Sequence, residues 1–294
     1  MSYIINCIRG FFMALADSVP GVSGGTIAFI LGFYDKFIGS LNGLIYGDKK
    51  EKLNSLKFLL KLGIGWIIGM GLASIVLTQL FETKIYIVSS VFLGFIIFAI
   101  PYIIREEKKV LKGKYKNLIF TLLGIVLVVL ITYLNTKINS NGIDVSHLTI
   151  ILMIQIFLAG MCAISAMVLP GISGSTLLLI FGLYVPIITA VRELIKLNFN
   201  YVPVLIIFGL GIITGVILII KLVKTCLDKH RSATIYFILG LMMGSIYAII
   251  MGPTTLEIPK EPISFSNFSI LAFILGGVFI LGLERLSLKF KDKE

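Results

Sequence analysis

A short run of small polar residues occurs twice in this sequence, each time inside an apolar stretch. The first motif reads PGVSGGTIAFILGFY from Pro20 to Tyr34, and the second reads PGISGSTLLLIFGLY from Pro170 to Tyr184. At a constant offset of 150 residues, the two motifs agree at 8 of 15 positions. Proline and glycine interrupt helices, while serine and threonine favour the start of the next one. A helix start with free N–H groups and hydroxyls is suited to binding an anion.

We therefore predict that each motif is a helix–break–helix hairpin, and that the two tips approach each other near the middle of the membrane. The residues predicted to bind the substrate there are Ser23, Gly24, Gly25, Thr26, Ser173, Gly174, Ser175 and Thr176. The residues predicted to form the turns at the tips are Pro20, Gly21, Pro170 and Gly171. Two full membrane spans joined by a tight turn are the alternative reading of each hairpin.

Charged residues near the motifs are candidates for coupling transport to an ion or for balancing charge: Asp17, Arg9, Arg192 and Glu193. Asp17 precedes the first motif, whereas Met167 has the equivalent place before the second. An acidic residue inside a membrane is costly and is often functional. The sequence leaves open whether Asp17 carries a proton or only caps free N–H groups. Arg9 lies one or two helical turns away, so an ion pair with Asp17 is a further reading.

Composition places the chain among polytopic membrane proteins. Of its 294 residues, 57% are hydrophobic and 14% are charged, against about 25% charged in soluble domains. The three cysteines and two histidines are not spaced as a disulfide framework or a metal site, so no metal or cofactor is expected. The net charge of +11 is attributed to basic cytoplasmic loops, not to nucleic-acid binding.

Apolar segments divide the single membrane domain into two repeats. The first repeat, 1–145, is predicted to contain a hairpin at 3–45 and helices at 58–80, 86–104 and 117–135. The second, 146–294, is predicted to contain a hairpin at 148–195 and helices at 201–223, 232–251 and 268–284. A GxxxG pattern occurs at Gly65–Gly69 and again, offset by 146, at Gly211–Gly215. This pattern indicates close helix packing.

Basic residues alternate between rich and poor connections. Four to six Lys or Arg lie in each of 46–57, 105–116, 221–231 and 285–293, whereas 81–85, 136–147 and 252–267 have one each. The rich connections and both termini should be cytoplasmic. This pattern requires each hairpin to be re-entrant and the two repeats to be inverted, as in many transporters. The predicted fold is an all-α polytopic membrane protein of two inverted repeats, each a re-entrant hairpin followed by three transmembrane helices.

The stretches ALADSVPGVSGGTIAFILGFYDKF and VLPGISGSTLLLIFGLY resemble the polyprenyl-phosphate transporter family over essentially the whole chain. The resemblance implies a multi-pass protein of the bacterial cytoplasmic membrane. It also implies that undecaprenyl phosphate is returned from the outer to the inner leaflet, which sustains peptidoglycan and envelope synthesis. The family's signature positions are represented here by Asp17, Pro20, Gly21, Ser23, Gly24, Gly25, Thr26, Pro170, Gly171, Ser173, Gly174 and Ser175.

Two other functions fit parts of the sequence. A transporter or channel for a soluble anion would need a continuous water path, whereas a lipid carrier needs an apolar-rimmed opening to the bilayer. A polyprenyl-pyrophosphate phosphatase would have arginine where Gly174 stands. It would also have an EGxxE-like acidic motif, which this sequence lacks. No ATP-binding motif is present. We expect a non-enzymatic transporter whose partners are the lipid and the bilayer; its oligomeric state is left open.

The charge pattern predicts the sidedness of two connections. A cysteine introduced at Asn141 should react with a membrane-impermeant thiol reagent in intact cells, because the basic-poor connection 136–147 faces outward. A cysteine introduced at Lys112 should be protected until the cells are opened. Labelling of the Lys112 cysteine in intact cells would contradict the inverted arrangement.

Overall fold

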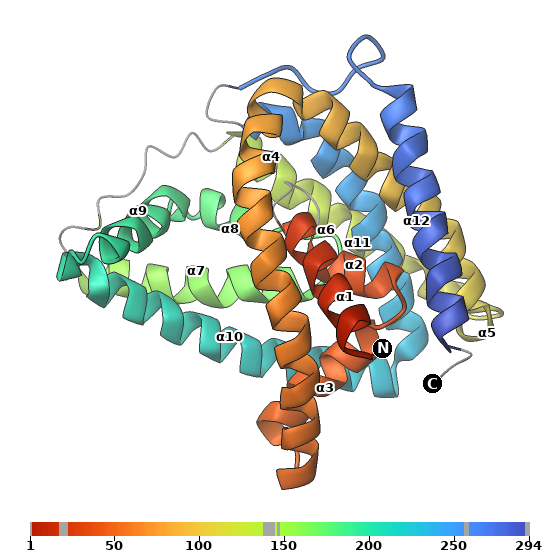
Figure 1. The fold of residues 1–294 in the computed structure, drawn as a ribbon, viewed down its shortest axis with the longest axis horizontal. Coiled ribbons are helices and arrows are strands. Elements are labelled where there is room, and N and C mark those ends of the chain that lie inside the picture. Colours follow the sequence, from red (N-terminus) through yellow and green to blue (C-terminus); the bar gives the residue numbers. More distant parts are fainter. Residues whose placement is uncertain (1, 18–22, 138–144, 146–147, 256–258, 292–294) are drawn as a thin grey trace.

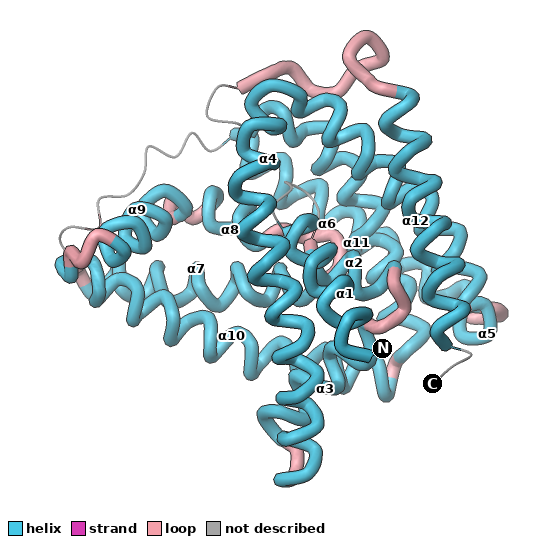
Figure 2. The backbone as a smooth tube through the Cα atoms, in the orientation of Figure 1, coloured by secondary structure: helices cyan, strands magenta, loops and turns pink. Residues whose placement is uncertain are grey.

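The computed structural model describes the backbone of residues 2–17, 23–137, 145, 148–255 and 259–291. It describes the side chains of these residues except at 2, 74–83, 136–137, 192, 195, 255 and 283–291. Within these ranges the chain is built of helices and short connections, without a strand (Figure 2). This confirms the predicted all-α class.

The helices of the first half surround the first motif. They are α1 (Ser2–Asp17), α2 (Gly24–Ile30), α3 (Tyr34–Tyr46), α4 (Lys49–Glu106), α5 (Lys108–Leu111), the short 3-10 helix η1 (Tyr115–Asn117) and α6 (Leu118–Lys137). The second half follows the same order. Its helices are α7 (Ile150–Val168), α8 (Gly174–Ile180), α9 (Tyr184–Ile195), η2 (Phe199–Tyr201), α10 (Val202–Lys229), α11 (Arg231–Met251), η3 (Gly252–Thr255) and α12 (Ile270–Lys291).

The second arm of each predicted hairpin is two helices instead of one. Gly32 and Gly182 both have φ of 69°, a left-handed conformation that glycine adopts at low cost. The N–H groups of Phe33 and Leu183 each reach back five residues to a carbonyl, at 3.0 and 2.9 Å. This is the Schellman ending of a helix. As a result α2 and α8 have only seven residues each, and α8 meets α9 at a bend of 111°.

The long helix α4 contains two segments that were predicted to be separate helices. The predicted helices 58–80 and 86–104 both lie within it, and the chain bends at Lys84, where φ is −134° and ψ is 36°. The helix also begins earlier than predicted. The Asp48 carboxylate accepts a hydrogen bond from the Glu51 N–H at 2.8 Å, and the Glu51 carboxylate accepts one from the Asp48 N–H at 3.4 Å. This capping box starts the helix within the basic stretch 49–57.

The two GxxxG patterns make equivalent contacts in the two halves. A Cβ atom at Gly65 would overlap the carbonyl oxygen of Cys7 in α1, and one at Gly211 would overlap that of Phe157 in α7. The two glycines are related by the repeat offset of 146, and their two partners by the repeat offset of 150. Each half therefore contains the equivalent contact. One turn later the same holds for Gly69 with Phe11 and for Gly215 with Met161. The glycines thus let α1 pack on α4, and α7 on α10, at backbone distance.

The last helix of each half packs against the other half. Helix α6 lies on α11, and α12 lies on α4. Gly240 allows the first contact by approaching the carbonyl of Thr121, and Gly94 allows the second by approaching the carbonyl of Phe273. The halves are therefore repeated and interleaved, which explains a shared core that draws residues from both. Their relative direction in a membrane stays a prediction.

Six described helical segments are long and apolar enough to cross a membrane. They are Lys49–Ala73, Lys84–Glu106, Tyr115–Asn135, Ile150–Val168, Phe199–Lys229 and Arg231–Thr254. In Figure 1 the junctions rich in lysine gather at the lower side: the start of α4, α5, the α10–α11 junction and the end of α12. The bend within α4 lies at the opposite, upper side. The basic connections thus share one end of the molecule.

The close approach of α1 and α4 makes Gly65 intolerant of a side chain. Gly65→Val should destabilise the protein by about 1–3 kcal/mol, because the added carbons must displace the α1 backbone. Gly63→Val is the matched control, since a Cβ atom there meets nothing within 4 Å. Thermal unfolding in detergent should show a lower midpoint for the Gly65 variant alone. Equal midpoints for both variants would argue against this packing.

Candidate functional site

The first and second motifs meet in a chain of hydrogen bonds. The Ser23 hydroxyl donates to the carbonyl oxygen of Leu169 at 3.0 Å. The Gly171 N–H donates to the Thr26 hydroxyl oxygen at 2.8 Å, and the Thr26 and Ser23 hydroxyls are 3.1 Å apart. Because the single Ser23 hydrogen is directed to Leu169, the Thr26 hydroxyl must donate to Ser23. The bonds therefore run in one direction, from Gly171 through Thr26 and Ser23 to Leu169.

This chain is enclosed by protein. Ser23 is 1% exposed and Thr26 is 0% exposed. Hydrogen bonds in sequence polarise one another, and a buried polar group left without a partner is costly. In this conformation, therefore, the two hydroxyls predicted to bind substrate hold the two motifs together. A ligand could use them only by replacing Leu169 and Gly171 as their partners. We refer to these four linked groups as the tip bridge.

Two further contacts tighten the tip bridge. A Cβ atom at Gly25 would lie 2.6 Å from the carbonyl oxygen of Val168, so only glycine fits there. The Tyr34 hydroxyl donates to the same oxygen at 3.2 Å, and Tyr34 is 2% exposed. Its counterpart in the second motif, Tyr184, is 36% exposed. The first motif therefore packs against the end of α7 through Gly25 and Tyr34. The exposed Tyr184 of the second motif is not buried in an equivalent contact.

The polar residues of the second motif are arranged differently. The Ser173 and Ser175 hydroxyls bond to each other at 2.7 Å, and the Ser173 side chain does not cap the α8 backbone. Ser173 is buried, whereas Ser175 and Thr176 are half-buried. A Cβ atom at Gly174 would lie 2.7 Å from the carbonyl oxygen of Ala163. Ser173 and Ser175 thus form a pair of hydroxyls at the start of α8, apart from the tip bridge.

Asp17 serves as a backbone cap in this structure. One carboxylate oxygen accepts a hydrogen bond from the Gly24 N–H at 2.6 Å, and the other accepts one from the Trp66 indole N–H at 2.9 Å. A Cβ atom at Gly24 would lie 2.9 Å from this carboxylate. The geometry is that of the capping alternative. It also places Asp17 beside the first motif. The Gly24 N–H that it accepts from belongs to the residue that follows Ser23 of the tip bridge.

The other predicted site residues are distributed more widely. Arg9 lies over the Phe33 ring at 4.9 Å and donates to Asn6 at 3.2 Å. Glu193, near the end of α9, accepts hydrogen bonds from Lys196 and Asn198 at 2.8 and 2.9 Å; α9 lies at the left edge of Figure 1. Pro170 is buried, and Gly171 has φ of 87°. Pro20, Gly21 and the Arg192 side chain lie outside the described residues.

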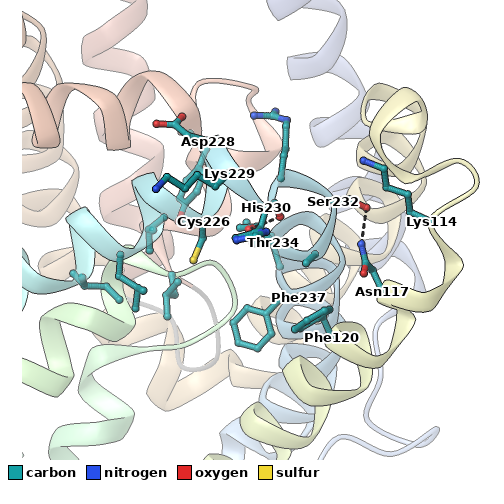
Figure 3. Close-up of a pocket in the computed structure, with 18 residues that line it drawn as sticks. Lys114, Asn117, Phe120, Cys226, Asp228, Lys229, His230, Ser232, Thr234 and Phe237 are labelled. Carbon is teal, nitrogen blue, oxygen red and sulfur yellow. Dashed lines mark hydrogen bonds between the residues drawn. The ribbon is translucent and has the colours of Figure 1, made fainter.

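A large cavity lies at the α10–α11 junction and is also lined by residues of α6 (Figure 3). We call it the basal cavity; its volume is about 980 Å³. Its lining includes Leu169, which belongs to the tip bridge, and Tyr34, which contacts the neighbouring Val168. Its walls are mainly apolar and come from α6, α10 and α11: Phe120, Ile219, Leu222, Val223, Phe237 and Ile238. Lys114, Lys229 and His230 lie around its mouth.

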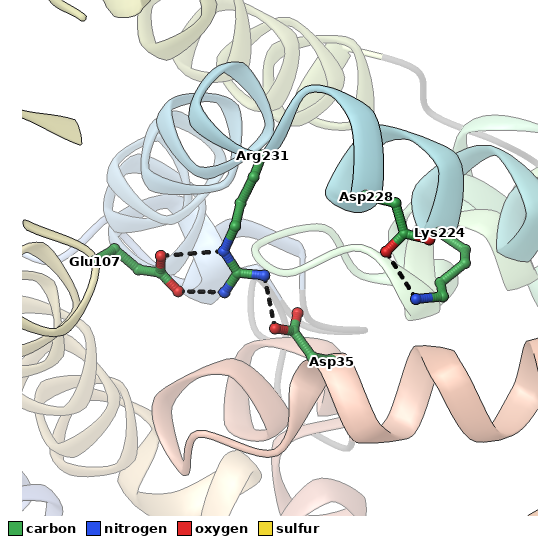
Figure 4. Close-up of polar contacts among 5 residues, drawn as sticks. All are labelled: Asp35, Glu107, Lys224, Asp228 and Arg231. Carbon is green, nitrogen blue, oxygen red and sulfur yellow. Dashed lines mark hydrogen bonds and ion pairs between the residues drawn. The ribbon is translucent and has the colours of Figure 1, made fainter. Parts of the chain in front are cut away.

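Two cations at this mouth are not neutralised. Arg231 also lines the cavity, but it donates to both oxygens of Glu107 at 2.5 and 3.3 Å and to Asp35 at 2.7 Å (Figure 4). Lys224 pairs with Asp228 at 2.7 Å. Lys114 and Lys229, by contrast, take part in none of the ion pairs among the described residues. The mouth therefore offers positive charge to an anion.

Sequence reasoning missed three parts of this site. Trp66 is the chain's one tryptophan and lies between the GxxxG glycines, where its indole N–H could have been recognised as a donor in need of a partner. A tyrosine is the last matching residue of both motifs, as Tyr34 and Tyr184, and the contact made by Tyr34 had no signal beyond that match. The basal cavity had no signal in the sequence, because its walls come from helices that are adjacent only in the folded chain.

The tip bridge should contribute to stability as a unit. Thr26→Val keeps the shape but leaves the Gly171 N–H without its acceptor, which should cost about 1–3 kcal/mol. Adding Ser23→Ala to the Thr26→Val variant should cost less stability than Ser23→Ala costs in the wild-type protein, because the bonds form one network. Thr176→Val, at the counterpart of Thr26, is the control outside the bridge. Strictly additive losses in thermal unfolding would show that the bonds are independent.

Comparison with known proteins gives consistent results. A family model described as undecaprenyl phosphate translocase-like matches residues 13–266. A polyprenyl-phosphate transporter of Staphylococcus aureus (strain NCTC 8325 / PS 47) is 35% identical over 283 residues, which cover 96% of this chain and 96% of that protein. One from Vibrio cholerae serotype O1 (strain ATCC 39315 / El Tor Inaba N16961) is 31% identical over 258 residues, covering 84% of this chain and 77% of that protein. No solved structure matches the chain significantly. The family model spans more than half of the sequence and includes both motifs, so this chain belongs to the undecaprenyl phosphate translocase-like family.

Proposed function

We propose that this protein carries polyprenyl phosphate across the bacterial cytoplasmic membrane and returns undecaprenyl phosphate from the outer to the inner leaflet for envelope synthesis. The observation that carries the proposal is the basal cavity. It combines apolar walls, an unpaired cationic mouth and a lining residue, Leu169, of the tip bridge. Family membership supports the same substrate, since the relatives are named polyprenyl-phosphate transporters.

The chemistry of the lipid explains why these features belong together. The isoprenoid tail is stable in hydrocarbon, but a charged phosphate cannot cross the bilayer core without polar partners. A carrier therefore needs a short polar route for the head and an apolar opening for the tail. The walls formed by Phe120, Leu222 and Phe237 suit the tail, and Lys114 and Lys229 suit the head.

The tip bridge then acts as the closed gate of the route. Opening it would free the Gly171 N–H and the hydroxyls of Ser23 and Thr26, which are suitable donors for phosphate oxygens. The hydroxyls of Ser173, Ser175 and Thr176 would complete the same polar region from the α8 side. Substrate would thus replace protein partners one for one, which keeps buried polar groups satisfied during passage.

Reconstituted vesicles provide a direct test of this function. Vesicles containing the protein and a fluorescent polyprenyl phosphate should expose nearly all of the dye to an impermeant quencher, because lipid exchanges between leaflets. Protein-free vesicles should protect the inner-leaflet half. Protection equal to that of protein-free vesicles would reject the proposal. Uptake of inorganic phosphate alone would favour a soluble-anion transporter, and release of phosphate from a polyprenyl pyrophosphate would favour an enzyme.

The role of Asp17 can be separated from capping by a charge-neutral substitution. Asp17→Asn should remain folded but lose the pH dependence of lipid transport between about pH 5.5 and about pH 8, because asparagine cannot change charge in this range. Asparagine has one acceptor oxygen, so its amide would face either Gly24 or Trp66 as a second donor. Asp17→Asn combined with Trp66→Phe removes this conflict. A wild-type rate and pH profile in the double variant would reduce Asp17 to a cap.

A further inference from the structure

A second cavity lies beside the first motif, between α1, α2, α4 and α12. Its volume is about 480 Å³, within the range of about 300–1,000 Å³ typical of small-molecule sites. Among the described residues that line it, Lys84 is the one polar side chain. Residues of the first half that line it include Phe12, Ala16, Ile27 and Leu31, so the cavity borders the hairpin that carries the tip bridge.

One wall of this cavity is the repeat counterpart of a wall of the basal cavity. Six of its lining residues lie on α4, and adding the offset of 146 to five of them gives a residue of the α11 region that lines the basal cavity. The pairs are Lys84 with His230, Ile87 with Ala233, Val88 with Thr234, Val91 with Phe237, and Phe92 with Ile238. The same offset relates the GxxxG contacts. The same face of an equivalent helix therefore lines both cavities.

Basic residues that line the two cavities lie at opposite ends of the molecule. Figure 1 places the bend of α4, which contains Lys84, at the upper side and the α10–α11 junction, which precedes α11, at the lower side. Lys84 is exposed and takes part in none of the ion pairs among the described residues. Each cavity thus has basic residues at its own end and an apolar wall leading toward the tips.

We propose that the second cavity is a separate binding site for polyprenyl phosphate on the side of the membrane opposite the basal cavity, with the phosphate at Lys84 and the first part of the isoprenoid chain along the apolar wall. This inference rests on the proposed function. It adds the site at which the carrier takes up lipid before the tips open, and it assigns Lys84 as the residue that selects the anionic head.

Charge and shape favour this ligand. A lysine ammonium provides up to three donors, which suit a phosphate monoester. The other described lining residues are all apolar. They fit a hydrocarbon chain, whereas the polar groups of a soluble anion would find no partners along them. Ile87, Leu275 and Val278 are 45%, 58% and 58% exposed on the neighbouring surfaces of α4 and α12. These surfaces give a lipid tail apolar contact along the edge of the cavity.

The test uses the full-length protein in nanodiscs and a photoreactive polyprenyl phosphate. Crosslinked peptides should include the α4 segment that begins at Lys84, and Lys84→Gln should reduce this labelling about tenfold, because a charge-assisted hydrogen bond is lost. Lys52→Gln, on the same helix but outside both cavities, should not. Ile87→Trp should block labelling by filling the cavity from a partly exposed position, whereas Ile97→Trp, 39% exposed and outside it, should not.

The outcomes separate this inference from the proposed function. Transport by the wild type together with unchanged labelling and transport in Lys84→Gln and Ile87→Trp would overturn the second site and leave the carrier function intact. Equal competition by phosphatidylglycerol would show a general lipid groove and would also overturn it. Absence of transport by the wild type would reject the carrier function, while Lys84-dependent labelling would still establish an anionic-lipid site.

Discussion

The hydrogen bonds from Gly171 through Thr26 and Ser23 to Leu169 constrain the rest of this molecule. They join the start of α2 to the non-helical segment between α7 and α8, across 145 and 146 residues of the chain. Polar groups buried in this way need partners, and the surrounding helices enclose them: Ser23 is 1% exposed and Thr26 is 0% exposed.

Close packing is achieved by glycine contacts that recur in both halves. Gly65 and Gly211 bring the long helices α4 and α10 onto α1 and α7. Gly94 and Gly240 bring the last helices onto the opposite half. Without a hydrophobic driving force between helices in lipid, such backbone-to-backbone approach supplies much of the attraction. The interleaved arrangement holds both motifs in place from several sides.

The halves differ where charge is concerned. Only the first motif has an acidic residue before it, and only Tyr34 of the two equivalent tyrosines is buried against the other half. Repeated architecture therefore gives two similar cavities, while local substitutions make their mouths different: Lys114, Lys229 and His230 at one, Lys84 at the other. This difference makes the two ends of the molecule chemically distinct.

The all-α class, the repeat, the GxxxG contacts and the family could be predicted from the sequence, because each depends on local residue type or a fixed spacing. The bend after each short helix had a local signal too, in Gly32 and Gly182, although it was overlooked. The partners of Ser23 and Thr26 could not be predicted. Composition suggested a ligand, whereas folding directed both hydroxyls to the other motif.

The sequence by itself thus determined which elements form and which residues are equivalent. Tertiary structure decided which polar groups are already paired, which cations at the cavity mouths are left unpaired, and where the cavities lie. The physical reason is that hydrogen bonding, charge pairing and cavity shape depend on side chains from distant segments. Trp66 with Asp17, and Arg231 with Glu107 and Asp35, are such pairs, and neither is separated by a spacing that a repeat or helix period would reveal.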